Sequence, residues 1–299
     1  MAIDRRVWCR VETGISGIRL ESKDALTKVE GKDVAEVVAS GRQPLVAHVL
    51  AALGVDTGLR VVTQSKVPAG SGLGDGAALA VAVAAAVAQA IGRGLEAEAL
   101  YAVARDAEAR TTGVPVGTLD QRTAVHGGIL ELSLEAGLLR GGSLRSDPGR
   151  IEEALVLVDS GESQHAATGD WEIVKAQIEG EARVREGLAS LAGTARRVRD
   201  ALTSHRYDAV GDLMAEEWEE RKRLTPGVTT PAIDRIVEVA RSAGGAGKAC
   251  GAGGGGMVAV WAPPGSRGPG VRERVEEALR GAGFRPLKFR VDLRGLEVD

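Results

Sequence analysis

Two carboxylates and a glycine-dense loop are the parts of this sequence best suited to chemistry. The loop spans residues 68–77, and Glu108 and Asp120 follow it. Backbone amides of a glycine loop bind phosphate oxygens, one carboxylate can bind Mg²⁺, and another can orient an attacking hydroxyl. These residue types meet the needs of phosphoryl transfer from a nucleoside triphosphate.

The glycine loop lies between a predicted strand and a predicted helix. Residues 59–64 are rich in β-branched side chains, whereas residues 77–91 form an alanine-rich run without proline. The unpaired N–H groups at a helix start attract phosphate. A flexible turn before a packing helix is the alternative interpretation, since the loop matches neither GxxxxGK[ST] nor GxGxxG.

A second glycine-rich segment lies about 180 residues further along the chain. It covers residues 251–256 and leads into the apolar strand predicted for residues 257–262. The two segments, if they face each other, would form opposite walls of one phosphate site. Taken alone, Glu108 also fits a solvated helix face, and Asp120 fits a turn.

Composition narrows the class of protein. The 299 residues are 44% hydrophobic and 26% charged, with a net charge of −3 and no basic block. This balance predicts a soluble protein that binds neither nucleic acid nor an anionic membrane. Two cysteines and four scattered histidines form no disulfide framework and no histidine or cysteine metal site. Without a signal peptide or a membrane-spanning run, the sequence favours a cytoplasmic protein that acts on a small molecule.

Strands and helices alternate in both halves, which predicts an α+β fold with helices layered on antiparallel sheet. Two domains are expected, residues 1–150 and residues 151–299. In the first, residues 4–11 and 17–22 are expected to pair as antiparallel strands, and Asp120 is placed in a loop. Further elements in the first half are predicted as helices at 43–53 and 95–112 and a strand at 128–134.

The second half is predicted to contain long amphipathic helices around a buried sheet. The apolar run from residue 154 predicts a buried strand with a polar loop at its tip. Helices are expected near 184–202, 207–224 and 271–283 and from residue 231, and a last strand at 287–292.

Three motifs resemble those of the GHMP small-molecule kinases, in the family's order. PAGSGLGDGAALAVA, residues 68–82, is similar to the central motif, and GKACGAGGGGMVAV, from Gly247, to the C-terminal glycine motif. GTLDQRTAVHGG resembles the segment that carries the family's catalytic aspartate. WEERKRLTPGVTTPAID, from Trp218, resembles the sugar-kinase branch that contains D-glycero-D-manno-heptose 7-phosphate kinases. The resemblance covers nearly the whole chain and implies a ribosomal-protein-like N-terminal domain and a ferredoxin-like C-terminal domain.

The resemblance also implies ATP and Mg²⁺ as cofactors and assigns roles to residues. Asp120 would take or orient the proton of the substrate hydroxyl, ionised at neutral pH beside a cation, and Glu108 would bind Mg²⁺. Lys248 would either add a positive charge near the phosphates or be solvated. Residues expected to surround the ATP phosphates or hold the loop beside them are Pro68, Gly70, Ser71, Gly72, Leu73, Gly74, Asp75, Gly76, Ala77, Gly251, Gly253, Gly254 and Gly255.

The chain departs from the family's pattern in two places. The family's paired Ser-Ser or Thr-Ser is here Asp75 and Gly76, so the hydroxyl that ligates Mg²⁺ is absent. Asp75 either substitutes a hard oxygen ligand or repels the triphosphate. Moreover, the family's N-terminal motif, with its Arg or Lys and its sugar-binding loop, would precede residues 2–11, where this chain begins. A fragment is expected rather than a natural variant without full activity.

These observations lead to one functional expectation and two alternatives. The expectation is ATP-dependent phosphorylation of a hydroxyl on a sugar or sugar phosphate, of heptose 7-phosphate, fucose or related type. One alternative is a catalytically silent nucleotide- or sugar-binding member of the same family. The other is a kinase for isoprenoid or amino-acid alcohols.

Overall fold

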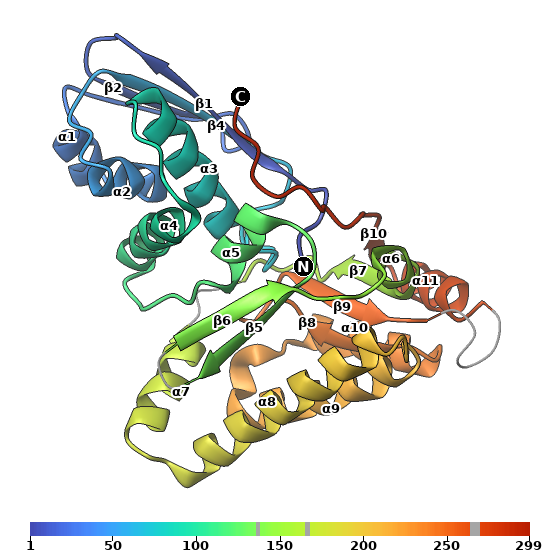
Figure 1. Cartoon of the computed structure of the whole chain (residues 1–299). Coiled ribbons are helices and arrows are strands. Elements are labelled where there is room, and N and C mark those ends of the chain that lie inside the picture. Colours follow the sequence, from blue (N-terminus) through green and yellow to red (C-terminus); the bar gives the residue numbers. More distant parts are fainter. Residues whose placement is uncertain (136–137, 165–167, 264–269) are drawn as a thin grey trace. The chain divides into compact units, whose positions relative to one another are not determined.

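The computed structural model describes residues 1–135, 138–164, 168–263 and 270–299, and it contains two compact units (Figure 1). The first comprises Met1–Ala69, Gly74–Gly128 and Asp292–Asp299, and the second comprises Gly70–Leu73 and Ile129–Val291. Each combines helices with mainly antiparallel strands, which confirms the predicted α+β class.

Residues 129–150, which were expected in the first domain, belong to the second unit. Ile129, Leu144 and Ile151 pack into a core cluster of the second unit, so the intervening residues group with that unit. The β-hairpin in this region pairs only with itself among the described strands.

A four-stranded sheet forms one layer of the first unit. Its order is β1-β4-β2-β3, in which β2 and β4 are parallel and the other neighbours antiparallel. The expected pairing of residues 4–11 with 17–22 is therefore wrong, because β4 lies between those strands. Leu59, Val61 and Val62 of β4 are buried, which suits a strand in the middle of a sheet. The bounds are β1 Val7–Thr13, β2 Ile18–Ser22, β3 Thr27–Gly31 and β4 Leu59–Ser65.

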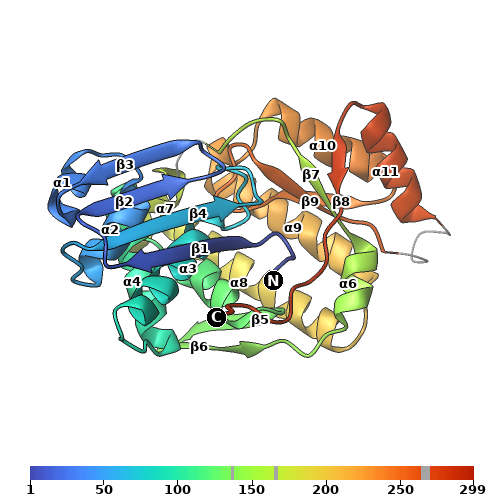
Figure 2. The same cartoon turned by 90° about the horizontal axis from the view of Figure 1, so that it is seen from above.

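Helices cover one face of this sheet, and α3 lies at their centre (Figures 1 and 2). Small side chains such as Ala80, Ala84 and Ala88 are almost fully buried on α3, so neighbouring elements approach it closely. It packs against β1, α2, α4 and α5. The helices are α1 Val34–Ala39, α2 Pro44–Ala52, α3 Asp75–Ala90, α4 Ala97–Thr112 and α5 Leu119–His126.

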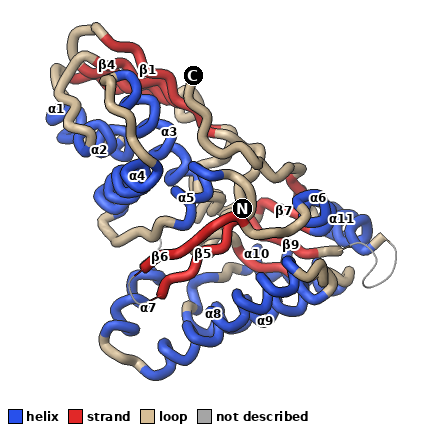
Figure 3. Tube along the Cα trace, in the orientation of Figure 1, coloured by secondary structure: helices blue, strands red, loops and turns tan. Residues whose placement is uncertain are grey.

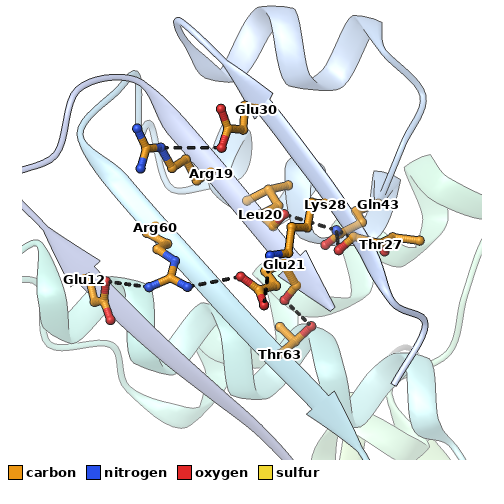
Figure 4. A network of polar contacts seen from close by, with 10 residues as sticks. All are labelled: Glu12, Arg19, Leu20, Glu21, Thr27, Lys28, Glu30, Gln43, Arg60 and Thr63. Carbon is orange, nitrogen blue, oxygen red and sulfur yellow. Dashed lines mark hydrogen bonds and ion pairs between the residues drawn. The ribbon is translucent and has the colours of Figure 1, made fainter. Parts of the chain in front are cut away.

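Charged side chains occupy the opposite face of the same sheet (Figure 4). Arg60 of β4 lies between two carboxylates, 3.1 Å from Glu12 of β1 and 3.1 Å from Glu21 of β2. Lys28 adds a further ion pair to Glu21. The period-two alternation of these strands thus separates an apolar, helix-covered face from a polar one.

Asp120 lies in the first turn of α5, so the expected loop is wrong. The helix has only eight residues and ends at Gly127, where φ is +67°, too short for a clear periodic pattern. The segment Asp292–Asp299 returns to the first unit and holds the end of α5: the Leu296 N–H donates to the Val125 carbonyl at 3.0 Å. Arg6 forms an ion pair with Asp292 at 2.7 Å in the same region.

The second unit is built on an antiparallel sheet of order β10-β7-β9-β8. Helices α9 and α10 contact its strands, and α8 lies beside α9 (Figure 3). The last strand covers Arg285–Leu287 instead of residues 287–292. The other elements are β5 Leu130–Glu135, β6 Leu138–Ser143, α6 Pro148–Ala154, β7 Leu155–Asp159, α7 Thr168–Ile178, α8 Ala182–Thr203, α9 Ala209–Leu224, η1 Pro226–Val228, α10 Pro231–Ser242, β8 Ala246–Ala249, β9 Met257–Trp261 and α11 Val271–Gly281.

Among the residues that the structure describes, no helix combines the length and the apolar character needed to cross a lipid bilayer.

Gly295 offers a test of the contact that holds α5. Its φ is +67°, and a Cβ there would clash with the Val125 carbonyl oxygen and lie 2.5 Å from the Gly127 nitrogen. Gly283 has φ +90° but open space around its Cβ position, so it is a matched control for backbone strain alone. We expect Gly283→Ala to lower the free energy of unfolding by about 1–2 kcal/mol. Gly295→Ala should lower it by ~1–3 kcal/mol more, measured by urea denaturation. Equal losses in the two variants would contradict this role of the C-terminal segment.

Candidate functional site

The glycine loop at residues 68–77 runs across the division between the two units. Gly70–Leu73 belong to the second unit, whereas Gly74 begins a stretch of the first unit that leads directly into α3. Gly74 is the residue before the helix and has φ +75°. The surroundings of the loop are therefore described separately in each unit.

In the first unit, three acidic side chains gather around the first turn of α3. Asp75 is the first residue of that helix, Glu108 comes from α4 and Asp120 from α5. The Asp120 Cγ lies 3.0 Å from where a Cβ on Gly74 would be, and the Glu108 Oε1 lies 3.1 Å from the corresponding position on Gly76. Both glycines let a carboxylate approach the helix start more closely than any side chain there would permit.

Burial is the main cause that raises the pKa of all three carboxyl groups. Burial, followed by repulsion from Asp120 and Asp75, raises the pKa of Glu108 to about 7. Burial also raises the pKa of Asp75, against the opposing effect of hydrogen bonds from the Asp75 and Gly76 backbone N–H groups. The Asp75 carboxylate therefore occupies two amide donors at the start of α3.

Asp120 has a different electrostatic environment. Burial of its carboxylate raises its pKa, and the positive charge of the Met1 amino group opposes that rise. Asp120 is exposed by its accessible surface, while its carboxylate lies against Gly74 on one side.

The acidic residues fit a divalent cation that is shared with a phosphate group. In the described part of the chain, no three His, Cys, Asp or Glu side chains are grouped so as to bind a metal by themselves. Mg²⁺ usually binds to one or two protein carboxylates and completes its shell with substrate phosphates and water. Glu108 and Asp75 offer carboxylate oxygens of this kind, and a cation would relieve the repulsion that raises the pKa of Glu108.

In the second unit, the two glycine-rich segments lie in contact. The Met257 N–H donates to the Ser71 carbonyl at 2.8 Å, and a Cβ on Gly256 would lie 2.5 Å from that same oxygen. A Cβ on Gly251 would lie 3.0 Å from the Gly72 Cα. These glycines are therefore needed for protein backbone to approach protein backbone.

Gln164 joins the two segments, and sequence reasoning missed it. Its backbone N–H donates to the Gly70 carbonyl at 2.9 Å, and its Nε2 donates to the Cys250 carbonyl at 2.8 Å. A Cβ on Gly72 would lie 2.5 Å from that Nε2. The signal available in the sequence was the polar stretch directly after β7, which was interpreted only as a loop tip.

The remaining predicted residues have varied surroundings. Gly253 and Gly255 pack against backbone of Val228 and Ser163, and Gly254 lies near Gly227. Lys248 pairs with Glu217 at 2.5 Å, so its charge is compensated and it is neither free nor simply solvated. Pro68 is exposed, Ala77 is buried, and Leu73 is partly buried.

The pKa of Glu108 predicts a specific dependence of stability on pH. Its folded pKa of about 7 exceeds its ordinary value of 4.5, so the folded state binds this proton more tightly than the unfolded state does. The associated stabilisation is complete below about pH 4.5 and is lost as the pH rises through about 7. Glu108→Gln removes this titration. Its stability relative to wild type should therefore rise as the pH is raised from about 4.5 to above 7, as measured by urea midpoints. Glu98→Gln, whose carboxylate is exposed, is the control. A constant difference between Glu108→Gln and wild type would contradict the raised pKa.

The hydrogen bonds of Gln164 predict that its replacement will loosen the two glycine-rich segments locally. Gln164→Ala removes the bond to the Cys250 carbonyl and leaves a gap between Gly72 and Gly251, so the amides of residues 70–73 and 250–256 should exchange faster with solvent. Hydrogen exchange followed by mass spectrometry measures this. Gln177→Ala, an exposed glutamine of the same unit, should leave those rates unchanged. Unaltered exchange in Gln164→Ala would show that the segments hold together without it.

Comparisons with known proteins agree with this arrangement of motifs. The family model for the GHMP kinases N terminal domain matches residues 38–128, and the model for GHMP kinases C terminal matches residues 198–281. Together these two matches cover more than half of the chain, one in its N-terminal part and one in its C-terminal part.

Curated relatives and solved structures give the same result. A bifunctional fucokinase/GDP-fucose pyrophosphorylase of Arabidopsis thaliana is 29% identical over 227 residues, which cover 74% of this chain but 21% of that protein. A galactokinase of Mycobacterium bovis is 29% identical over 249 residues, covering 74% of this chain and 68% of that one. The structure of a D-glycero-D-manno-heptose 1-phosphate kinase from Bacteroides thetaiotaomicron superposes with a TM-score of 0.74 at 20% identity, covering 99% and 89% of the two chains. That likeness shows the shared two-domain fold. The chain belongs to the GHMP kinase family.

Proposed function

We propose that this protein transfers the γ-phosphoryl group of ATP to a hydroxyl of a sugar or sugar phosphate. One observation carries the proposal: within the first unit, Glu108 and Asp120 flank the start of α3, at the end of the glycine loop. Family membership supports a kinase, and the fucokinase and galactokinase among the relatives favour a carbohydrate acceptor. The likeness to a heptose phosphate kinase fits a sugar-phosphate acceptor of the same size class.

Asp120 is the group proposed to handle the proton of the acceptor hydroxyl. As that oxygen bonds to the γ-phosphorus, the bond from the phosphorus to the bridging oxygen of ADP breaks, and the hydroxyl proton passes to the Asp120 carboxylate. The raised pKa of this carboxyl makes it a stronger base than an ordinary aspartate. Its place beside Gly74 would keep the acceptor oxygen next to the phosphate-binding loop.

The glycine loop and the start of α3 are proposed to bind the triphosphate. Backbone amide N–H groups of a glycine loop and the positive end of a helix dipole favour an anion. Glu108, with Asp75, would hold Mg²⁺, which supplies positive charge to offset the charge that develops on the phosphate oxygens. Glu108 directs one carboxylate oxygen to the Gly76 side of that helix.

A catalytically silent binding protein remains the second candidate, and Asp75 is the observation that favours it. Its carboxylate accepts backbone hydrogen bonds at the helix start, where a serine hydroxyl of the family would leave those donors to phosphate. A negative charge at this position opposes the triphosphate unless a cation lies between them. Calorimetry with ATP separates the candidates: nucleotide binding without Mg²⁺ and without turnover favours the silent protein.

Asp120→Asn tests the proposed reaction. ADP release is measured by a coupled assay with heptose, fucose, arabinose and galactose derivatives as acceptors. Removing the base should lower kcat by about 10²–10⁴-fold and leave the affinity for ATP within a few-fold of wild type. Asp106→Asn, an exposed aspartate of α4 that pairs with Arg105, is the matched control and should keep full activity. Full activity of Asp120→Asn, or no turnover of any acceptor by the wild-type protein, would overturn the proposed role.

A further inference from the structure

Gln121 is a buried polar side chain that the proposed reaction does not yet use. It follows Asp120 on α5, is 1% exposed and ranks among the largest fully buried side chains of the chain. Its Nε2 donates a hydrogen bond to the Glu108 Oε2 at 2.7 Å. One short helix therefore carries both Asp120 and the donor that binds Glu108.

The hydrogen bond fixes the direction of the Glu108 carboxylate. With Oε2 bound to Gln121, Oε1 lies toward the first turn of α3, 3.1 Å from where a Cβ on Gly76 would be. Burial of this carboxylate, and then repulsion from Asp120 and Asp75, act against this placement and raise the pKa of Glu108. The amide donor offsets that repulsion, because a hydrogen bond to a charged acceptor is stronger than one between neutral groups.

Burial of the Gln121 amide costs free energy unless its hydrogen bonds offset the loss of solvation. Its Oε1 has no hydrogen-bond partner among the described residues, and an orphaned buried acceptor costs about 1–3 kcal/mol. A leucine would fill a similar volume without that penalty. The opposite amide orientation would place Oε1 against a carboxylate, so the donor assignment is the favourable one for an ionised Glu108.

Gly76 completes this arrangement. A serine at that position would place its Cβ 3.1 Å from the Glu108 Oε1, which is tighter than ordinary contact. The residue that lacks the family's hydroxyl thus gives the Glu108 carboxylate room to approach the helix start. The approach depends on a donor that holds the carboxylate there.

We infer that Gln121 is a positioning residue of the phosphoryl-transfer site, which holds the Glu108 carboxylate toward the start of α3 so that it can bind the cation accompanying the nucleotide. The inference rests on the proposed function, because it assigns the cation to that reaction. It adds a residue whose role is to orient a ligand and not to touch the substrate. Groups of this kind typically change metal affinity by about 10–100-fold when they are removed.

The test compares Gln121→Leu, and Gln121→Met as a second variant of similar size, with wild type and with Gln89→Leu. Gln89 is an exposed glutamine on α3 of the same unit. Mn²⁺ is titrated calorimetrically into each protein in the presence of a non-hydrolysable ATP analogue, and the analogue is titrated separately without metal. Thermal unfolding is measured in parallel.

We expect both Gln121 variants to bind Mn²⁺ about 10–100-fold more weakly in the presence of the analogue, with unchanged metal-free affinity for the analogue. Their melting temperatures should stay within a few degrees of that of wild type, because removal of the orphaned Oε1 offsets loss of the hydrogen bond to Glu108. Gln89→Leu should match wild type in all three measurements. A purely structural Gln121 would instead lower the melting temperature and weaken nucleotide binding with and without metal, which would overturn the inference.

The outcomes also separate this inference from the proposed function. Metal and analogue binding that is normal in wild type and unchanged in both Gln121 variants refutes the positioning role alone. Absence of any metal-dependent binding in wild type refutes the proposed function and the inference together.

Discussion

Close packing around α3 sets the distances on which the candidate site depends. Its buried face consists largely of alanine and valine, so α4 and α5 can lie against it without long intervening side chains. Short side chains at this contact bring Glu108 and Asp120 within reach of the first turn of the same helix. A larger residue at the buried Ala80 or Ala84 would not fit without shifting the elements packed around α3.

The same close packing brings three negatively charged side chains together, and their charge is only partly compensated within the first unit. Three carboxylates share a confined space, and each has a raised pKa. Backbone N–H groups at the helix start and the Gln121 amide supply partial compensation. A site that is left with uncompensated negative charge is suited to a ligand that brings its own cation, as a metal–nucleotide complex does.

Local patterns in the sequence predicted most helices and strands. They did not predict which residues distant in the sequence are in contact. Helices α3 and α4 and strand β4 follow from the helix or strand propensity of their residues and from the glycines that bound them. The α+β class follows from the mixture of helices and strands in both halves of the chain. Pairing order did not follow, because nothing local shows that β4 enters between β1 and β2. Asp120 was misplaced in a loop because an eight-residue helix contains barely two turns of pattern.

The two glycine-rich segments are a second case in which the sequence did not reveal a long-range contact. Their composition indicated close backbone approach, but it did not reveal whether a ligand or the protein itself approaches. In the second unit, the neighbours of Gly72 and Gly251 are each other and Gln164. That glutamine is 92 positions from Gly72 in the sequence, and a lone polar residue after a strand carries no periodic signal. The catalytic and metal-binding roles of the predicted residues remain predictions.

The return of Asp292–Asp299 to the first unit has a consequence for how the protein matures. Residues around Leu296 are synthesised after the entire second unit, yet they secure the end of the helix that bears Asp120. The first unit therefore closes by a contact of very large sequence separation, which forms late and slowly. A nascent chain arrested before this segment therefore lacks the hydrogen bond from Leu296 that secures the end of α5.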